Sequence, residues 1–424
     1  MPSTGTPFGA LRHRNFRLFI FGQFVSLCGT WMQGVALGWL VLTLTDSAFA
    51  VGLVSAMGAL PVLLFTLQGG ALADRINRHR ALTLLQTGML LEALVLAVLA
   101  YTHHATLPWI IVLALISGLL GAFEIPIRQS FLMDLVGRDN LMNAIAMNSM
   151  AFNVSRVIGP ALAGIIVAAA GPPVAFFVNA ASYLAVIGAL LAIRPDPALI
   201  VPHRTPPPLA EALRYILAPG WPRTLVTLST IYTIFGTSFL TVLPVYARNV
   251  LGTGAAGFGG LTSAFGVGAA AGALLLAAWG ARYRRGLIAL RGGLVIGGSL
   301  LLMAALPNYP IAFTLLVMGG AAAAISAIVT NTLLQTEAPD HLRGRVIGFY
   351  SFIVVGLAPF GALQAGWVGE HLGVRTEAAI GGAIVFLAAL WMLTTVRRFT
   401  GPPAGERRQA EPVRPYRWGE RRHA

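Results

Sequence analysis

The sequence predicts an all-α membrane protein with twelve transmembrane helices in two pseudo-symmetric six-helix bundles. Three observations predict this class: the composition, the length of the apolar blocks and a repeat between the two halves. Of 424 residues, 56% are hydrophobic and only 10% are charged, which leaves too few polar groups to cover the surface of a soluble domain. The apolar residues form blocks of roughly 20 residues or more, the length that crosses a bilayer.

Twelve such blocks follow one another along the chain. The first six define a predicted N-terminal bundle at 1–194, with spans at 16–44, 48–73, 81–102, 107–131, 141–170 and 173–194. After a polar, proline-rich linker at 195–221, a predicted C-terminal bundle at 222–397 has spans at 223–250, 255–280, 286–306, 309–335, 342–369 and 376–397. The basic tail at 398–424 is predicted to be disordered and cytoplasmic.

The distribution of arginine predicts the orientation of the chain. All 29 basic residues are arginine, and the formal net charge is +14. Because the arginines lie between the apolar blocks, they indicate topology signals and contacts with membrane lipids, and no nucleic-acid partner is expected. Most of them fall in loops on the side of the termini, so the positive-inside rule places both termini and the linker in the cytoplasm. The first block is too long for the core of a cleaved signal peptide and is predicted to remain as a span.

The two halves of the chain resemble each other. Residues 44–75 align without a gap with residues 251–282, so that Arg75 falls on Arg282. Residues 137–149 also align with residues 339–351. Two matches in the same order indicate a duplicated six-span unit, as transporter folds often have.

A charged loop joins spans 2 and 3. It reads GALADRINRHR at 70–80 and resembles the loop signature of the major facilitator superfamily, with Asn77 in place of the second glycine. The resemblance implies the major facilitator fold and a conformational latch, made by Gly70, Asp74, Arg75 and Arg78. Asp74 would face the start of span 11 near residues 340–345, where the dipole of a helix N-terminus favours a carboxylate. The alternative is a solvated turn without such a role.

Span 5 contains a second signature, RVIGPALAG at 156–164. It resembles the signature of the antiporters, meaning exporters, of the same superfamily, through Gly159, Pro160 and Gly164. A proline within a span frees a carbonyl and bends the helix, and glycines permit close packing. The resemblance favours export, and the alternative is a static kink that serves packing alone.

Longer stretches narrow the resemblance. Residues 16–47, 121–164 and 172–184 are similar to the enterobactin-exporter-like branch, also described as transmembrane secretion effectors. This implies a multi-pass protein of the bacterial inner membrane that exports an amphipathic small molecule, such as a siderophore, a drug or a secondary metabolite. It also implies proton-coupled antiport by alternating access. The chain departs from the pattern at Thr30, where the branch often has an acid, and at 113–123, which lacks the span 4 arginine of proton-coupled drug exporters.

Ionisable groups inside a span are costly, so each one needs a reason. The candidates for proton coupling are Glu92, Glu124 and Arg156. Glu92 is the carboxylate expected nearest the middle of the membrane, and an inter-helix hydrogen bond is the alternative to a proton site. Glu124 precedes Arg128 by four residues, a spacing that permits an ion pair on one helix face. This pair could serve as a gate or be purely structural. Arg156 could hold an anionic substrate, pair with Glu92 or Glu124 until a proton releases it, or form a permanent bridge between helices.

Polar and aromatic side chains would line a central cavity if the family architecture holds. The candidates are Trp31, Gln33, Asn148, Asn153, Tyr232, Ser238 and Asn331, each with helix packing as the alternative. Aromatic rings and amides suit an amphipathic organic molecule better than a bare ion, which would need rings of acids or carbonyl groups.

No enzymatic activity, cofactor or metal site is predicted. A chain without lysine cannot contain the phosphate-binding motif GxxxxGK[ST], so transport must be driven by a gradient, and the resemblance implies protons. The single cysteine, Cys28, excludes an intramolecular disulfide. Two alternatives to export remain open: uptake of a nutrient or lipid by the same fold, and a non-transporting membrane sensor or assembly partner.

Overall fold

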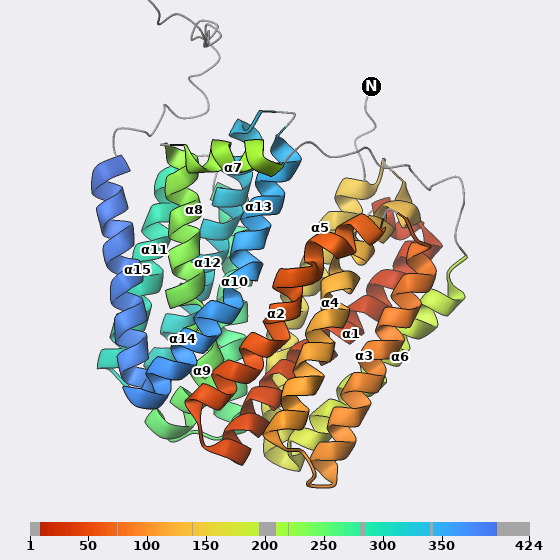
Figure 1. Ribbon diagram of the computed structural model, residues 1–424, viewed down its shortest axis with the longest axis horizontal. Helices are drawn as coiled ribbons and strands as arrows, with labels where there is room; N and C mark the ends of the chain where they lie inside the picture. Colours follow the sequence, from red (N-terminus) through yellow and green to blue (C-terminus); the bar gives the residue numbers. More distant parts are fainter. Residues whose placement is uncertain are drawn as a thin grey trace, which may run out of the picture.

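The computed structural model describes residues 9–73, 75–137, 139–194, 209–218, 220–279, 285–339 and 342–396. In this part of the chain, twelve helical segments are long and apolar enough to cross a membrane. They match the twelve predicted spans, and they pack as two bundles of six (Figure 1). The predicted fold class is therefore confirmed. The predicted tail and residues 195–208 of the predicted linker lie outside the described residues.

The spans of the N-terminal bundle are single, long helices. After a short 3-10 helix, η1 (Gly9–Arg12), they are α1 (Arg14–Thr45), α2 (Ala48–Ala73), α3 (Arg78–Tyr101), α4 (Leu107–Val136), α5 (Leu141–Ala170) and α6 (Pro172–Ala192). Local sequence sets their ends. Oδ1 of Asn77 accepts a hydrogen bond from the backbone N–H of Arg80 and so caps α3. Gly137 and Gly171 adopt positive φ where α4 and α5 stop.

The spans of the C-terminal bundle are less regular. Span 7 is divided into α8 (Trp221–Ile231), η3 (Tyr232–Gly236), α9 (Phe239–Val245) and η4 (Tyr246–Val250). Three regular spans follow, α10 (Ala255–Trp279), α11 (Arg285–Ala305) and α12 (Tyr309–Glu337). Span 11 is divided into α13 (Arg343–Gly356) and α14 (Ala358–His371), and the last span is α15 (Val374–Val396).

These divisions correct the two single helices predicted at 223–250 and 342–369. Both η3 and η4 are π-helical turns, in which the backbone N–H bonds to a carbonyl five residues back. Thr237 donates to Tyr232 at 2.9 Å, and Leu251 donates to Tyr246 at 3.1 Å. Span 11 breaks at Leu357 because Pro359 follows in the first turn of α14, where its ring and missing N–H prevent a continuous helix.

The predicted linker also contains a helix that the sequence did not predict, α7 (Leu209–Leu217). Its Ile216 is fully buried among apolar residues of the C-terminal bundle that include Val226 and Val346. The hydroxyl of Tyr215 donates to the carbonyl oxygen of Glu337 at 3.3 Å. Helix α7 therefore packs across one end of the C-terminal bundle, as Figure 1 shows.

The two bundles share one packing scheme. Helix α2 packs on α4 as α10 packs on α12, and α3 packs on α6 as α11 packs on α15. These pairs correspond to spans 2 and 4, 8 and 10, 3 and 6, and 9 and 12. The correspondence agrees with the duplicated unit that the internal repeat predicted.

The bundles meet along two helix pairs, α2 with α14 and α5 with α10. Each pair is close because glycine faces glycine. A Cβ on Gly366 would lie 3.0 Å from Cα of Gly52, and a Cβ on Gly164 would lie 3.1 Å from Cα of Gly259. These contacts lie toward the end at which α1 leads into α2. In Figure 1 the bundles converge at that end and diverge at the end that carries α7.

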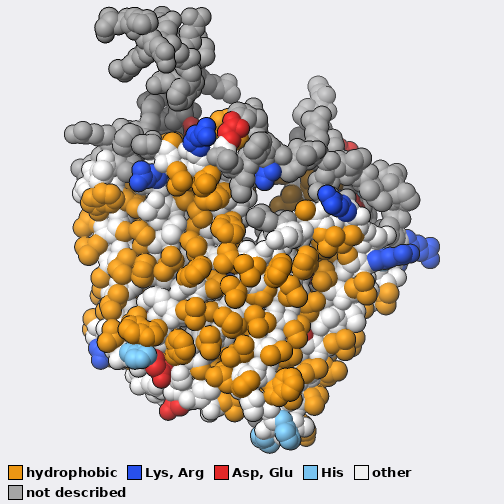
Figure 2. Space-filling model, in the orientation of Figure 1, with side chains coloured by type: hydrophobic (Ala, Val, Ile, Leu, Met, Phe, Trp, Pro, Cys, Tyr) orange, Lys and Arg blue, Asp and Glu red, His pale blue; other side chains and the backbone are white. Residues whose placement is uncertain are grey.

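The outer surface has the character of a membrane protein. Figure 2 shows hydrophobic side chains over most of the visible face, while arginines gather mainly near the end that carries α7. A wide apolar belt with charge at its margins is what a bilayer requires of a spanning protein.

Candidate substrate and coupling sites

Arg156 lies at the contact between the two bundles. It projects from α5, and its guanidinium carbon lies 5.4 Å from the ring centre of Trp31 on α1 and 4.9 Å from that of Phe265 on α10. Tyr232, in the π-helical turn η3, lies within electrostatic range of the same guanidinium. Stacking on aromatic faces stabilises an arginine that is largely removed from water. We call Arg156, Trp31, Phe265 and Tyr232 the arginine cage.

The glycines of the span 5 signature position this cage. A Cβ on Gly159 would lie 2.6 Å from both the carbonyl oxygen of Cys28 and Cβ of Trp31, so only glycine lets α5 approach α1 at that level. About one and a half turns of helix connect this contact to the Gly164–Gly259 contact with α10. Two residues before Gly159, the carbonyl oxygen of Val157 accepts a hydrogen bond from Oγ of Ser263 on α10 at 3.0 Å. The signature therefore fixes α5 against one helix of each bundle.

Glu92 lies inside the N-terminal bundle, away from the arginine cage. Its two carboxylate oxygens accept hydrogen bonds from Nε2 of Gln33 at 3.3 and 3.1 Å. Nδ2 of Asn179 donates to Oε1 of Gln33 at 2.5 Å, and Oγ of Ser182 donates to Oδ1 of Asn179 at 3.1 Å. Glu92 is thus the end of a buried hydrogen-bonded chain that joins α3, α1 and α6.

Glu124 forms the predicted i,i+4 ion pair. Nε of Arg128 donates to Oε1 of Glu124 at 2.8 Å, and both side chains are buried. Gln86 donates to the same oxygen at 3.3 Å, and Arg128 donates to Oδ1 of Asn148 at 3.1 Å. The group joins α3, α4 and α5 inside the N-terminal bundle.

The alternative pairing of Arg156 with Glu92 or Glu124 is not formed in this conformation. Glu92 is bonded to Gln33 and Glu124 to Arg128, and no carboxylate lies within ion-pair distance of Arg156 in the part of the chain that the structure describes. The aromatic rings of the cage instead offset part of the cost of holding the half-buried guanidinium away from water.

The cavity candidates fall into separate environments. Trp31 and Tyr232 come together in the arginine cage, Gln33 belongs to the Glu92 chain, and Asn148 belongs to the Glu124 group. Asn153 donates to the carbonyl oxygen of Ser149, and Asn331 accepts from Gln335, both on their own helices. Ser238 is 4% exposed, and its Oγ has no hydrogen-bond partner in the part of the chain that the structure describes. The sequence thus predicted two cage members but could not separate them from structural amides.

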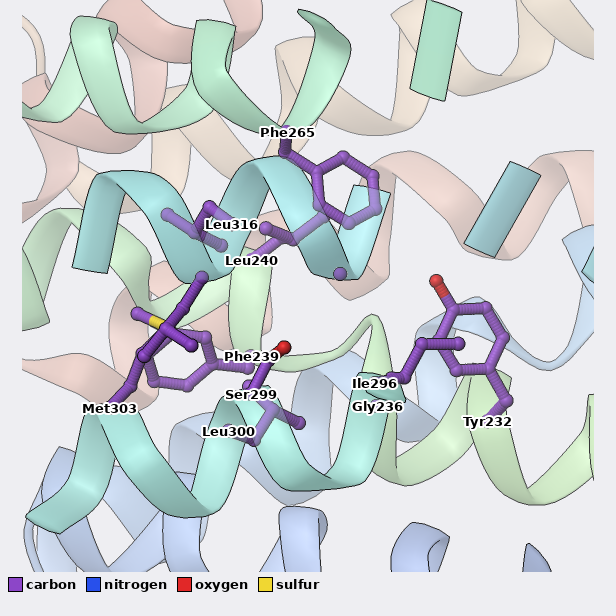
Figure 3. A pocket seen from close by; sticks show the side chains of 12 residues that line it. Tyr232, Gly236, Phe239, Leu240, Phe265, Ile296, Ser299, Leu300, Met303 and Leu316 are labelled. Carbon is purple, nitrogen blue, oxygen red and sulfur yellow. The ribbon is translucent and has the colours of Figure 1, made fainter. Parts of the chain in front are cut away.

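A small cavity opens beside the arginine cage inside the C-terminal bundle (Figure 3). It lies between η3, α9, α10, α11 and α12, and Tyr232 and Phe265 line it together with apolar residues such as Phe239 and Met303. Its polar members are the hydroxyl groups of Tyr232 and Ser299. Two residues of the cage therefore also form the wall of an apolar cavity.

Two functional candidates escaped the sequence prediction. Phe265 carries no signal, because a phenylalanine in an apolar span is expected anyway. Glu377 is the second residue of the predicted span 376–397 and was not among the candidates. The structure instead buries its side chain completely, near the first turn of α15. Glu377 therefore joins Glu92 and Glu124 as a buried carboxylate.

The predicted latch is described in part. Arg78 donates from Nη1 to both carboxylate oxygens of Asp134 on α4, at 2.8 and 3.0 Å, and from Nε to the carbonyl oxygen of Ala73 at 2.9 Å. Arg75 is exposed, and a Cβ on Gly70 would meet nothing within 4 Å. Asp74 lies outside the described residues, as do Asp340 and His341 of its expected partner, so its contact with span 11 stays a prediction.

The chain is similar to exporters along nearly its whole length. A family model described as transmembrane secretion effector matches residues 5–413. The staphyloferrin A transporter of Staphylococcus aureus (strain NCTC 8325 / PS 47) is 28% identical over 391 residues, covering 86% of this chain and 92% of that protein. The multidrug efflux pump Tap of Mycolicibacterium fortuitum is 28% identical over 373 residues, covering 84% and 90%. The enterobactin exporter EntS of Salmonella typhi is 28% identical over 397 residues, covering 92% and 95%.

Solved transporter structures share the fold. A bacterial homologue of the human lysosomal transporter Spinster, in an inward-facing and unoccupied conformation, has a TM-score of 0.71 at 17% identity and covers 93% of this chain and 99% of that chain. A mutant of the peptide transporter POT in complex with alafosfalin has a TM-score of 0.74 at 15% identity and covers 94% and 97%. At this identity the likeness concerns the fold alone.

Proposed function

Because this chain belongs to the transmembrane secretion effector family, we propose that it exports an amphipathic small organic molecule by alternating access. Two bundles around a central site can open in turn to either side of the membrane by rocking against each other. Its relatives are named for a siderophore and for drugs, so siderophores, drugs and chemically similar secondary metabolites are the proposed substrate class.

The arginine cage is the observation that carries this proposal. A guanidinium without a carboxylate partner among the described residues stands between aromatic rings from both bundles. In such a low-dielectric site a cation favours an anionic group, and the rings favour a planar, apolar one. A molecule with an acidic group and an aromatic or apolar body has both. Because the cage takes residues from both bundles, a bound molecule would respond to their relative motion.

We infer from the arginine distribution that the end carrying α7 faces the cytoplasm. The contacts between the bundles then lie on the opposite, periplasmic side, which corresponds to an inward-open state. The proposed latch, with Gly70, Asp74, Arg75 and Arg78, would close the cytoplasmic side in the other state. The bonds of Arg78 to Asp134 and Ala73 support this role, since they hold the loop rigidly against α4.

Proton coupling is proposed at Glu92, with Glu124 as the second candidate. Gln33, which donates to Glu92, lies two residues from Trp31 on α1. A proton that neutralises Glu92 would weaken this charge-assisted bond and could shift α1 at the arginine cage. Glu124 is already compensated by Arg128, so a proton there would instead release Arg128 and Asn148.

The cage is tested by replacing Arg156. We expect Arg156→Ala to weaken binding of amphipathic anions about tenfold or more, because a hydrogen bond to a charged group contributes about 1.5–3 kcal/mol. The measurement is the Kd of purified protein for a panel of aromatic carboxylates and catecholates, together with their efflux from intact cells.

Neutral analogues of each compound and the variant Arg291→Ala serve as controls, since Arg291 is exposed on α11. Arg156→Lys retains the charge but not the planar stacking group, so it should fall between Ala and wild type. Equal affinity of wild type and Arg156→Ala for every anion in the panel would show that the arginine cage does not bind the substrate.

A further inference from the structure

Glu377 of α15 is a buried carboxylate that neither the proposed substrate site nor the proposed latch uses. We propose that Glu377 is a second proton-binding site, and that its protonation sets the geometry of the π-helical turn η3. The step is the simple exchange of Glu377–COOH for Glu377–COO⁻ and H⁺. The inference rests on the proposed gradient-driven transport, but its test does not require a known substrate.

The surroundings of Glu377 exclude water. Its side chain is 0% exposed, and neither Oε1 nor Oε2 has a hydrogen-bond partner in the described part of the chain. Helix α15 packs closely on α11 at the same level, because a Cβ on Gly382 would lie 2.9 Å from the carbonyl oxygen of Gly297. An ionised carboxylate without partners is strongly unfavourable in such a site, so the neutral acid is the form that this packing accommodates.

A backbone carbonyl lies close to the carboxyl group of Glu377 across Gly381. A Cβ on Gly381 would collide with the carbonyl oxygen of Phe235 and would lie 3.7 Å from Oε1 of Glu377. Both oxygens therefore lie on the same side of Gly381, which has no side chain to separate them. A neutral carboxylic acid can donate a hydrogen bond toward a carbonyl oxygen, whereas an ionised carboxylate repels it.

Phe235 belongs to the π-helical turn η3, and so does Tyr232 of the arginine cage. A π-helical turn holds one residue more than an α-helical turn and is a common site of local rearrangement. Repulsion between Glu377 and the carbonyl oxygen of Phe235 would therefore act on the turn that carries Tyr232. The protonation state of Glu377 can thus affect the position of Tyr232 in the arginine cage through η3, a turn of five residues.

Within the described residues, no charged side chain near α15 compensates Glu377. On its own helix, Arg375 donates from Nε to the carbonyl oxygen of Ala304 at 3.0 Å. Apart from Tyr232 of the cage, the other charged or titratable side chains on the elements packed against α15 either bond to other residues or are exposed to solvent. Those that bond elsewhere are Tyr246 with Met303, Arg248 with Asp46, Glu370 with Ser47, and His371 with Trp367. Arg223 and Arg291 are exposed. The side chain of Arg285 lies outside the described residues.

The chemistry of the site favours a proton over a metal cation. Hard cations such as Ca²⁺ take six to eight oxygen ligands, whereas the Glu377 side chain supplies two. In the described ranges no three His, Cys, Asp or Glu side chains form a group that could hold a metal ion. A proton needs a single carboxylate and a single acceptor.

In each bundle, one of two corresponding helix pairs carries a buried acid. Glu92 lies on α3, which packs on α6, and Glu377 lies on α15, which packs on α11. These helix pairs are counterparts in the two halves. Glu92 accepts a hydrogen bond from Gln33, whereas Glu377 has no donor in the described chain. Loss of the proton therefore leaves a negative charge without a hydrogen-bond donor at Glu377, but not at Glu92.

The test is infrared difference spectroscopy of the purified protein in lipid nanodiscs over a pH series. We expect a carboxylic acid C=O band that disappears as the pH rises and is absent from Glu377→Gln. As a second readout, 3-fluorotyrosine at position 232 should show a pH-dependent ¹⁹F shift that Glu377→Gln abolishes.

Asp139→Asn is the matched control, because it removes an exposed carboxylate and should retain both signals. If Glu377→Gln does not fold, Glu377→Asp moves the acid by one methylene and should displace the band instead. A band that is unchanged in both variants, or that responds to sodium in place of pH, overturns the proposal. Normal titration of Glu377 in a protein that exports nothing would contradict the proposed function and leave this site intact.

Discussion

Gly159 shows how a single residue controls the arginine cage. Its missing side chain lets α5 approach α1 so closely that Trp31 reaches Arg156, and Trp31 also packs edge-to-face on Phe152 at 5.6 Å. The position of the guanidinium thus depends on backbone contact as much as on its own rotamer. Such contacts are worth little in hydrophobic transfer, because lipid is as apolar as the protein interior, and they depend on fit.

We therefore expect Gly159→Ala to destabilise the protein by about 1–3 kcal/mol, the range for overpacking a close contact. A Cβ there would lie 2.6 Å from two atoms of α1, the carbonyl oxygen of Cys28 and Cβ of Trp31, neither of which can move without moving the helix. Thermal unfolding in detergent measures the loss. Gly188→Ala is the matched control, since a Cβ at Gly188 would meet nothing within 4 Å; equal unfolding temperatures for the two variants would contradict the packing argument.

The candidate residues were predictable only where chemistry stands out from an apolar background. Arg156 and Glu92 are conspicuous in the sequence because charge is rare in a span, whereas Phe265 looks like any other apolar residue. Glu377 was missed for a different reason. It stands at the start of the predicted span 376–397, and its complete burial depends on helix packing that a single sequence does not reveal.

At the scale of helices, length was easier to predict than continuity. The twelve predicted apolar blocks correspond to twelve spans, since the length of a span can be read from its run of apolar residues. The break in span 11 has a local cause in Pro359, but the π-helical turn at 232–236 contains no proline. Its hydrogen bonds shift by one residue because of tertiary packing, for example the contact of Gly361 with the carbonyl of Thr233, which a single sequence does not reveal.

One helix of the N-terminal bundle is capped by the other bundle. Oγ of Ser47 accepts a hydrogen bond from the N–H of Ala50 at the start of α2. Oε2 of Glu370, on α14, accepts from Oγ of Ser47 at 3.0 Å and from the N–H of Phe49 at 3.1 Å. Nearby, Arg248 of η4 forms an ion pair with Asp46. These bonds join the bundles at the end away from α7 and must break when that end opens.

We expect the double variant Glu370→Gln, Arg248→Ala to shift the conformational equilibrium about tenfold toward the state that is open at this end. The exposed ion pair contributes about 0–1 kcal/mol and the carboxylate at the helix N-terminus about 0.3–1 kcal/mol. Double electron–electron resonance between spin labels at the ends of α2 and α14 reports the distance distribution.

Arg375→Ala is the control, because Arg375 lies at the same end but bonds within the C-terminal bundle, to Ala304. A distance distribution identical to that of wild type in the double variant would mean that other contacts hold this end closed.

At the scale of the whole molecule, most buried polar bonds lie within the bundles, and glycines make the closest helix contacts between the bundles. The Glu92 chain and the Glu124 group tie α1, α3, α4, α5 and α6 together. Between the bundles, Gly52 faces Gly366 and Gly164 faces Gly259. This distribution suits two rigid bodies that rock about a smooth interface, which is the motion that alternating access requires.

The central claim is that this molecule moves amphipathic compounds out of the cytoplasm with a gradient as the driving force. Everted membrane vesicles test it most directly, with the compound panel applied with and without an imposed proton gradient, for wild type and Glu92→Gln. We predict gradient-dependent accumulation inside the everted vesicles, and loss of the gradient dependence in Glu92→Gln. Accumulation in right-side-out vesicles instead would contradict export, and wild-type transport that ignores the gradient would contradict proton coupling.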